Sequence, residues 1–352
     1  MNSPNQGKVI SRAAGREFAS GVLWILCLGF LSGCTGQVKK EVVIYCALDR
    51  EFSEPILDKY QQASGIEIHA KYDAESTKTV GLANAIIAER NRPRCDLFWN
   101  NEILHTLRLE KLGLLEVFEP DEPTSWPAEF RDPQGKWFGF AGRARVLLVN
   151  TEIVPHDQRP DSVDDLLDPR WQGKTGLAKP LFGTTATHAA VLFANRGGEA
   201  ALDFFRQFKT NGVVLSGNKQ VAEAVSAGQI AFGLTDTDDA LIEVEAGRPV
   251  EIVFPDQAEG QPGTLLIPNT LCMIRGGPQP AAAREIARRV VSKETELALL
   301  EATSAQIPLH RDVVRQSRVL PEQRPRWMKV DFPLAAEKWE SASKQLRAIF
   351  AE

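Results

Sequence analysis

The sequence is poor in the residues that build most catalytic and metal centres. Its 352 residues include five histidines and five cysteines. No pair of histidines has the His-Glu-x-x-His spacing of zinc peptidases, and the cysteine spacing fits no zinc site. The sequence also lacks the Gly-x-Ser-x-Gly segment of many hydrolases and the Gly-x-Gly-x-x-Gly segment of dinucleotide-binding proteins. These absences favour a protein that is not an enzyme.

An excess of positive charge is missing as well. Lysine and arginine total 41 against 46 acidic residues, which gives a formal net charge of −5. Because nucleic-acid binding depends on a basic face, this charge argues against a nucleic-acid partner. Five cysteines are too few for a disulfide-built scaffold in a chain of this length. The composition is that of a globular protein, and the length suggests about two domains.

Residues 1–33 have the parts of an export signal. A basic start is followed by an apolar run over residues 21–31 and by small residues before Cys34. The run is too short to span a bilayer, which takes roughly 20 helical residues. The ending Leu-Ser-Gly-Cys34 resembles the bacterial lipobox, in which the cysteine becomes the first residue and carries lipid. This resemblance predicts a signal peptide over 1–33, lipidation of Cys34 and a lipid-anchored leash over 34–41. A plain secretory signal or an N-terminal membrane anchor is the alternative.

Short apolar runs alternate with amphipathic segments along most of the chain. The alternation predicts an α/β fold, with a mixed, mostly parallel sheet flanked by helices. Ser53 is expected to cap the first helix. Strands are expected at 42–46, 66–72, 95–99, 137–150 (as two segments around Gly142), 175–178, 213–215, 229–234, 250–254 and 263–268.

Polar side chains follow several of these strands. Asp49, Asn101 and Asp236 each come after an apolar run, and ligands of open α/β sheets bind beyond the carboxyl ends of strands. Thr184 and Thr185 begin a predicted helix, where free N–H groups favour an anion. Capping of that helix by a threonine explains the same pattern equally well.

Two arginines lie two residues apart on a predicted strand. Arg143 and Arg145 therefore face the same side of that strand. Together they offer two guanidinium groups to an anion or to carboxylates. Surface salt bridges are the alternative interpretation.

An acidic cluster opens a later helix. Asp236, Asp238 and Asp239 place three carboxylates within four residues. Acids at this position can cap the helix and complement its dipole. They can also form a ligand site, because clustered acids repel one another unless a cation or hydrogen-bond donors neutralise them. A hard cation with oxygen ligands would suit such a cluster.

Taken in order, several segments resemble the periplasmic solute-binding proteins of ABC importers. The fold implied is the type II binding-protein fold, and the resemblance is greatest to its ferric-iron-binding branch. It covers nearly all of 41–310. The segments that carry it are Val43–Asp49, Asp96–Glu102, Gly142–Val146, Asn218 and Gln229–Asp236.

The resemblance implies two α/β lobes joined by two crossing strands, with the ligand held in the cleft between them. Lobe one would comprise 42–141 plus about 260–310, and lobe two would comprise 142–259. Residues 311–352 would form a C-terminal helical segment packed on the lobes. Hinge closure would then trap the ligand.

The resemblance also implies a set of ligand-binding residues, with a metal bound at Asp238 and Asp239. In the ferric branch a pair of adjacent tyrosines falls on those two positions. The chain has three tyrosines, and none of them lies there. The remaining implied ligand-binding residues are Asp49, Asn101, Glu102, Arg143, Arg145, Thr184, Thr185, Asn218 and Asp236.

The function implied is that of a monomeric, lipid-anchored protein on the periplasmic side of a bacterial envelope. It would deliver a small charged solute to an ABC permease and its ATPase in the inner membrane. Iron(III) or another hard metal cation is the expected cargo, and no cofactor is expected. A small anion such as a phosphonate, phosphosugar or carboxylate is the alternative cargo. A lipid-anchored hydrolase, with His188 as its base, is a second alternative.

Overall fold

The structure is a computed structural model that describes residues 40–73 and 79–350. The predicted signal peptide, Cys34 and most of the predicted leash lie outside the described residues. No helix within the described ranges is both long enough and apolar enough to cross a membrane.

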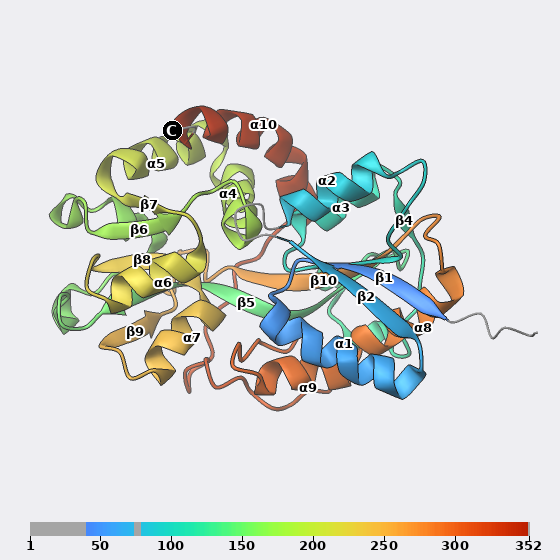
Figure 1. The fold of residues 1–352 in the computed structure, drawn as a ribbon. Helices are drawn as coiled ribbons and strands as arrows, with labels where there is room; N and C mark the ends of the chain where they lie inside the picture. The colour runs from blue at the N-terminus through green and yellow to red at the C-terminus, as the bar shows by residue number, and fades with distance from the viewer. Residues whose placement is uncertain (1–39, 74–78, 351–352) are drawn as a thin grey trace, which may run out of the picture. The chain divides into compact units, whose positions relative to one another are not determined.

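The described chain is built around one mixed β-sheet with helices on both faces (Figure 1). Its strand order is β2-β1-β3-β10-β5-β8-β6-β7, with β4 paired to β10 and β9 paired to β5. This arrangement confirms the predicted fold class. The strands are β1 (Glu41–Cys46), β2 (Glu67–Tyr72), β3 (Leu97–Asn100), β4 (Leu115–Glu116), β5 (Trp137–Asn150), β6 (Thr175–Ala178), β7 (Val213–Leu215), β8 (Phe232–Asp236), β9 (Val250–Val253) and β10 (Leu266–Ile274).

The helices divide between the two faces of the sheet. Apolar side chains of α2, α3, α4, α5 and α10 pack in one buried cluster, and those of α1, α6, α7, α8 and α9 pack in another. The helices are α1 (Arg50–Ser64), α2 (Val80–Ala88), α3 (Leu104–Lys111), α4 (Gly183–Arg196), α5 (Gly198–Asn211), α6 (Asn218–Ser226), α7 (Thr237–Glu245), α8 (Pro280–Val290), α9 (Lys293–Glu301) and α10 (Phe332–Phe350).

Alternation along the strands explains how both faces are covered. In β1, Val42, Ile44 and Cys46 belong to one cluster, while Tyr45 belongs to the other. Successive side chains of a strand point to opposite faces, so a strand that is buried on both sides becomes a continuous apolar run. The apolar runs of the sequence are therefore the strands of this sheet.

Two long strands connect the two groups of parallel strands. β1 pairs in parallel with β2 and β3, and β6 pairs in parallel with β7 and β8. β5 pairs antiparallel with β10 along its first part and with β8 and β9 along its second part. We call β1–β4 with α1–α3, α8 and α9 the first lobe, and β6–β9 with α4–α7 the second lobe. The predicted residue boundaries of the lobes stay a prediction.

The segment 137–150 is one strand with a bulge, so the prediction of two segments around Gly142 was wrong. Gly142 pairs with Pro268, Phe140 pairs with Asn269, and Ala141 between them has no partner on β10. Ala141 has a φ of 43°, which is uncommon for a residue other than glycine. A bulge inserts one residue and bends the strand without ending it.

Two further expectations are corrected. Helix α1 begins at Arg50 and not after Ser53, whose hydroxyl donates back to the carbonyl oxygen of Asp49 at 3.0 Å. Strand β10 runs from Leu266 to Ile274 and so extends well beyond the predicted 263–268. Pro268 marked the predicted end, but proline is tolerated where a bulge shifts the register.

The C-terminal helix α10 contacts helices of both lobes, α4 and α5 in the second and α3 in the first (Figure 1). Its buried residues recur at helical spacing and include Phe332, Trp339 and Phe350. Cys46, Cys95 and Cys272 are buried free thiols.

We predict that Gly263→Ala destabilises the fold more than Gly260→Ala. Both glycines have positive φ, +90° and +81° respectively. A Cβ at Gly263 would lie 2.6 Å from the carbonyl oxygen of Arg326, whereas nothing lies within 4 Å of one at Gly260. The free energy of unfolding in urea should fall by about 1–3 kcal/mol more for Gly263→Ala, because overpacking adds to backbone strain. Equal losses for the two variants would contradict this packing.

Candidate functional site

A cavity of about 480 Å³ is lined by residues of both lobes and by Arg143 of β5. All the predicted ligand-binding residues line it except Glu102 and Arg145. Asp49 and Asn101 come from the first lobe, Arg143 lies on β5, and the others lie at the end of a strand or in the first turn of a helix of the second lobe. The predicted ligand-binding and metal-binding residues that line the cavity are Asp49, Asn101, Arg143, Thr184, Thr185, Asn218, Asp236, Asp238 and Asp239.

A buried ion pair lies beneath this cavity. Arg145 is 0% exposed, and its Nη1 donates to Asp236 Oδ1 at 2.6 Å and to Asn218 Oδ1 at 3.0 Å. Its Nη2 donates to Thr185 Oγ1 at 3.3 Å. The other oxygen of Asp236 accepts hydrogen bonds from Thr184 Oγ1 at 2.5 Å and from Asn218 Nδ2 at 2.9 Å. The predicted role of Arg145 as a group facing the ligand is therefore corrected: its guanidinium is used within this network.

The structure contradicts helix capping, one of the two interpretations left open for the two threonines, and anion binding there stays a prediction. Helix α4 has Phe182 at its N-cap and no side-chain cap, so neither Thr184 nor Thr185 caps it. Burial raises the pKa of Asp236, but the guanidinium groups of Arg145 and Arg143 and the hydrogen bond from Thr184 together lower it by more. The pKa of Asp236 therefore lies below its ordinary value, and Asp236 is a carboxylate.

Arg143 is the buried arginine that lines the cavity. It is 3% exposed, and its Nη2 donates to the carbonyl oxygen of Asn101 and to Asn269 Oδ1, both at 3.0 Å. Its Nε lies 3.6 Å from Asp238 Oδ2. Burial lowers the pKa of Arg143, but the carboxylates around it, Asp238 first, raise it by more. Arg143 therefore carries its full positive charge among acids, and the interpretation of the two arginines as surface salt bridges was wrong.

The acidic cluster converges in space. Carboxylate oxygens of Asp236, Asp238 and Asp239 lie within 4.8 Å of one another, which is close enough to share a cation. Asp236 contributes least to such a site, because its two oxygens already accept three hydrogen bonds. Asp238 and Asp239 lie in the first turn of α7, where they also complement the helix dipole.

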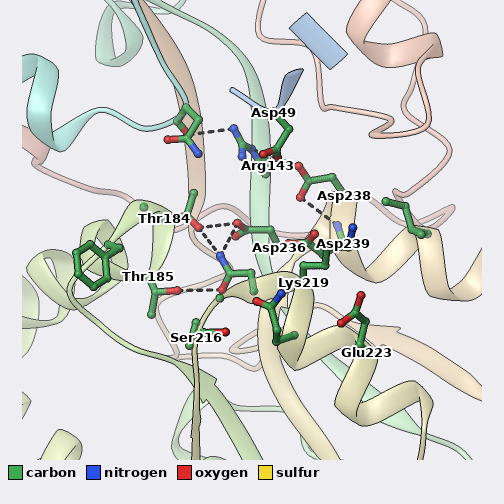
Figure 2. Close-up of a pocket in the computed structure, with 18 of the residues that line it drawn as sticks. Asp49, Arg143, Thr184, Thr185, Ser216, Lys219, Glu223, Asp236, Asp238 and Asp239 are labelled. Carbon is green, nitrogen blue, oxygen red and sulfur yellow. Dashed lines mark hydrogen bonds and ion pairs between the residues drawn. The ribbon is translucent and has the colours of Figure 1, made fainter. Parts of the chain in front are cut away.

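Two helix N-termini line the cavity beside Asp236, whose carboxylate accepts hydrogen bonds from Thr184 of α4 (Figure 2) and from Asn218 of α6. α4 begins after Phe182 and α6 begins after Gly217, and no side chain caps either helix. Their first N–H groups have no acceptor within the helix, so they favour an anion. Lys179 and Lys219 also line the cavity.

The predictions missed Lys179 and the segment Ser216–Lys219, apart from Asn218. The signal was present in the sequence, because Ser216 directly follows the apolar strand Val213–Leu215. The rule that ligands bind beyond strand ends would have found it.

Glu102 does not reach the cavity, so its predicted role in ligand binding is corrected. One carboxylate oxygen accepts Asn100 Nδ2 at 2.7 Å and the backbone N–H of His105 at 2.9 Å. The other accepts the N–H of Leu104 and the hydroxyl of Thr187 at 2.8 Å. Glu102 thus satisfies the first turn of α3 and joins it to α4 of the second lobe.

His188 offers no support for the hydrolase alternative. It is buried and does not line the cavity. Burial, followed by the charge of Arg145, lowers the pKa of His188 well below its ordinary value. Neither ring nitrogen has a hydrogen-bond partner in the described chain. The pairing of His188 with a nucleophile, on which this alternative rested, is therefore not found among the described residues.

Comparisons with known proteins agree with this geometry. The family model described as bacterial extracellular solute-binding protein matches residues 56–320. A curated relative, the Fe(3+)-binding periplasmic protein of Serratia marcescens, is 25% identical over 193 residues, which is 55% of this chain and 56% of that protein. The alignment thus spans little more than half of that relative.

Solved structures show the same fold. Iron-bound HitA from Pseudomonas aeruginosa superposes with a TM-score of 0.77 at 22% identity, over 87% of this chain and 99% of that one. AfuA from Actinobacillus pleuropneumoniae, with bound fructose-6-phosphate, superposes with a TM-score of 0.77 at 21% identity, over 88% of this chain and 98% of that one. The fold is therefore the two-lobed α/β fold of periplasmic binding proteins.

We predict that Arg145→Met lowers the free energy of unfolding by about 3–5 kcal/mol, because it leaves the buried carboxylate of Asp236 without its counter-ion. The double variant Arg145→Met/Asp236→Leu should recover much of this loss, because no buried charge then remains. Chemical denaturation measures both values, and Lys219→Met, at an exposed lysine of the cavity, is the control. A double variant no more stable than Arg145→Met would contradict the ion pair.

Proposed function

Because the chain belongs to the family of bacterial extracellular solute-binding proteins, we propose that it captures a small charged solute in the cavity and delivers it to an ABC permease and its ATPase. The observation that carries this proposal is a cavity of about 480 Å³ with charged walls from both lobes. The relatives are binding proteins, so the chain is a binding protein in the periplasm and not an enzyme. Any iron it binds would be cargo and not a cofactor. Its monomeric state stays a prediction.

The connection between the lobes supports a mechanism of hinge closure. β5 and β10 are the strands that connect them, and residues of both lobes line the cavity. A solute that binds residues of one lobe first would gain contacts with Asp49 and Asn101 on closure. It can shift the equilibrium toward the closed state only by its difference in affinity for the two states.

We infer that the solute has an anionic group, such as a phosphate or phosphonate, and a second end with hydroxyl or ammonium groups. The uncapped starts of α4 and α6, together with Lys179 and Lys219, suit the anionic group. Carboxylates suit the second end, since they accept hydrogen bonds from hydroxyl and ammonium groups. The volume also exceeds what one bare ion would fill.

A hard metal cation, iron(III) first, is the second candidate cargo. The observation that favours it is the convergence of the oxygens of Asp236, Asp238 and Asp239 within 4.8 Å. The replacement of the tyrosine pair by Asp238 and Asp239 would make such a site weaker and less selective for iron(III). The charge of Arg143 close to Asp238 also opposes a multivalent cation.

Two variants separate these cargoes by isothermal titration. Asp238→Asn/Asp239→Asn should abolish binding of iron(III) if metal is the cargo, and should preserve or strengthen binding of inorganic phosphate if the anion is the cargo, because negative charge is removed. Lys219→Met should weaken phosphate binding about tenfold, a loss of about 1.4 kcal/mol.

Lys209→Met is the matched control, because Lys209 is exposed and does not line this cavity. Native mass spectrometry of protein purified without added metal or chelator gives the mass of any retained solute. Wild-type protein that binds neither probe and retains no small molecule would contradict the proposed function.

The lipobox-like segment carries a separate proposal, that lipid on Cys34 anchors the protein to the envelope. One acyl group alone binds membranes only marginally, so an anchor of this kind needs more than one chain. We predict that Cys34→Ser shifts the protein from the membrane fraction to the soluble periplasmic fraction and abolishes incorporation of labelled fatty acid. Cys46→Ser, at a buried thiol, should retain the label. A labelled Cys34→Ser protein would rule out lipidation at this residue.

A further inference from the structure

A buried asparagine connects the cavity to the bulge in β5. Asn269 lies on β10 and is 0% exposed. Its Oδ1 accepts Nη2 of Arg143 at 3.0 Å, and its Nδ2 donates to the carbonyl oxygen of Ala141 and to Gln306 Oε1. A single amide group therefore holds both the cavity's arginine and the bulged residue.

A buried glutamate holds the other side of the same bulge. Glu296 of α9 is 0% exposed, and its Oε1 accepts the N–H of Ala141 at 3.1 Å. The carboxylate also accepts the backbone N–H groups of Leu309 at 3.0 Å and His310 at 3.2 Å, and Nε1 of Trp126 at 3.3 Å. Four donors from three segments thus meet on one carboxylate.

These bonds form a continuous chain from the first lobe to the cavity. It runs from Glu296 through Ala141 and Asn269 to Arg143, whose Nη2 also reaches the carbonyl oxygen of Asn101. The bulge at Ala141 has a strained φ of 43°, and such strain persists only where the surroundings fix it. The N–H of Ala141 is fixed by Glu296 and its carbonyl oxygen by Asn269.

We propose that Glu296 and Asn269 are positioning residues for ligand binding: they fix the bulge in the connecting strand and thereby orient Arg143 in the cavity, so that the affinity for the solute depends on the protonation of Glu296. This inference rests on the proposed function, because it concerns how the same cavity binds its solute.

The direction of the pH dependence follows from the surroundings of Glu296. Burial raises its pKa to about 7, although the four hydrogen bonds oppose the shift. Above this pH the carboxylate accepts hydrogen bonds from all four N–H groups. Protonation converts one of its oxygens into an O–H donor, which can no longer accept in the same way. The orientation of Arg143 should therefore loosen, and affinity should fall, as the pH decreases from 8 to 6.

Other titratable groups near Glu296 do not produce this change. His310 presents its backbone N–H to Glu296, and its ring nitrogen lies 3.3 Å from Glu122. Burial lowers the pKa of His310, so its ring stays neutral over most of this range. Burial raises the pKa of Tyr60, which bonds to Thr295 beside Glu296, so Tyr60 also stays neutral. The backbone N–H of Asp312 donates to Nδ1 of His310 at 3.2 Å.

The test compares affinity at pH 8 and pH 6 by isothermal titration, with inorganic phosphate and iron(III) nitrilotriacetate as separate probes. Wild type should bind whichever of the two probes it recognises about fivefold more weakly at pH 6 than at pH 8. A fivefold change is at the low end of typical coupling between distant sites. Asn269→Ser should bind more weakly than wild type at both pH values. Glu301→Gln should show the same fall in affinity between pH 8 and pH 6 as wild type, whereas Glu296→Gln should show a clearly smaller one, because it lacks the group that titrates.

Glu301→Gln is the matched control, because Glu301 lies exposed on the same helix. A change between pH 8 and pH 6 that is equal in Glu296→Gln and Glu301→Gln would overturn the proposal.

A second measurement needs no ligand. The ¹⁵N signal of Arg143 Nε, assigned with Arg143→Lys, should shift with a midpoint near pH 7 in ligand-free wild type, the pKa of Glu296. If neither probe binds but this signal titrates, the proposed function fails while the positioning chain stands. A signal that does not change between pH 6 and 8 overturns the positioning chain, whether or not Glu296→Gln folds.

Discussion

The buried ion pair between Arg145 and Asp236 is the constraint on which the rest of the site depends. Both charges are removed from water, and the cost of that removal is offset only while all their partners stay in place. The groups involved come from different elements: Thr184 lies in the first turn of α4, Asn218 begins α6, and Asp236 directly precedes α7. The pair therefore holds three helix starts around one point. The cavity above them keeps its shape because moving any one of these helices would leave a buried charge unpaired.

The same pair determines which charges face the solute. Arg145 and Asp236 neutralise each other, so the charge of the cavity is set by the side chains around them. Asp238 and Asp239 add negative charge to the lining, and the uncapped starts of α4 and α6 add N–H groups that favour anions. Arg143 lies among the acids, and its positive charge weakens their attraction for a cation. This mixture of charges is the basis for the proposed solute with two chemically different ends.

Much of this architecture is predictable from the sequence, because it follows from local rules. Apolar runs become strands buried on both faces, and polar residues after them meet at one edge, which placed Asp49, Asn101 and Asp236 correctly in the cavity. Strand periodicity likewise placed Arg143 and Arg145 on one face. Periodicity does not reveal that Arg145 forms a buried ion pair with Asp236, which lies 91 residues away in the sequence. For Glu102, the geometry of the turn after β3 decides whether its carboxylate accepts hydrogen bonds from the first turn of α3 or reaches a ligand. Such choices are made by tertiary contacts.

The bulge shows why long-range contacts carry the remaining information. The sequence around Gly142 suggests a break, since glycine is frequent where strands end or bend. The strand nevertheless continues, because Ala141 donates a hydrogen bond to Glu296 and accepts one from Asn269, and both residues are more than 120 positions away in the chain. A connecting strand needs such support more than an ordinary strand does. It pairs with strands of both groups and also places Arg143 at the cavity. An unsupported bulge would let that arginine adopt several orientations. Buried polar residues behind a binding site are thus part of the site, even when the solute never touches them.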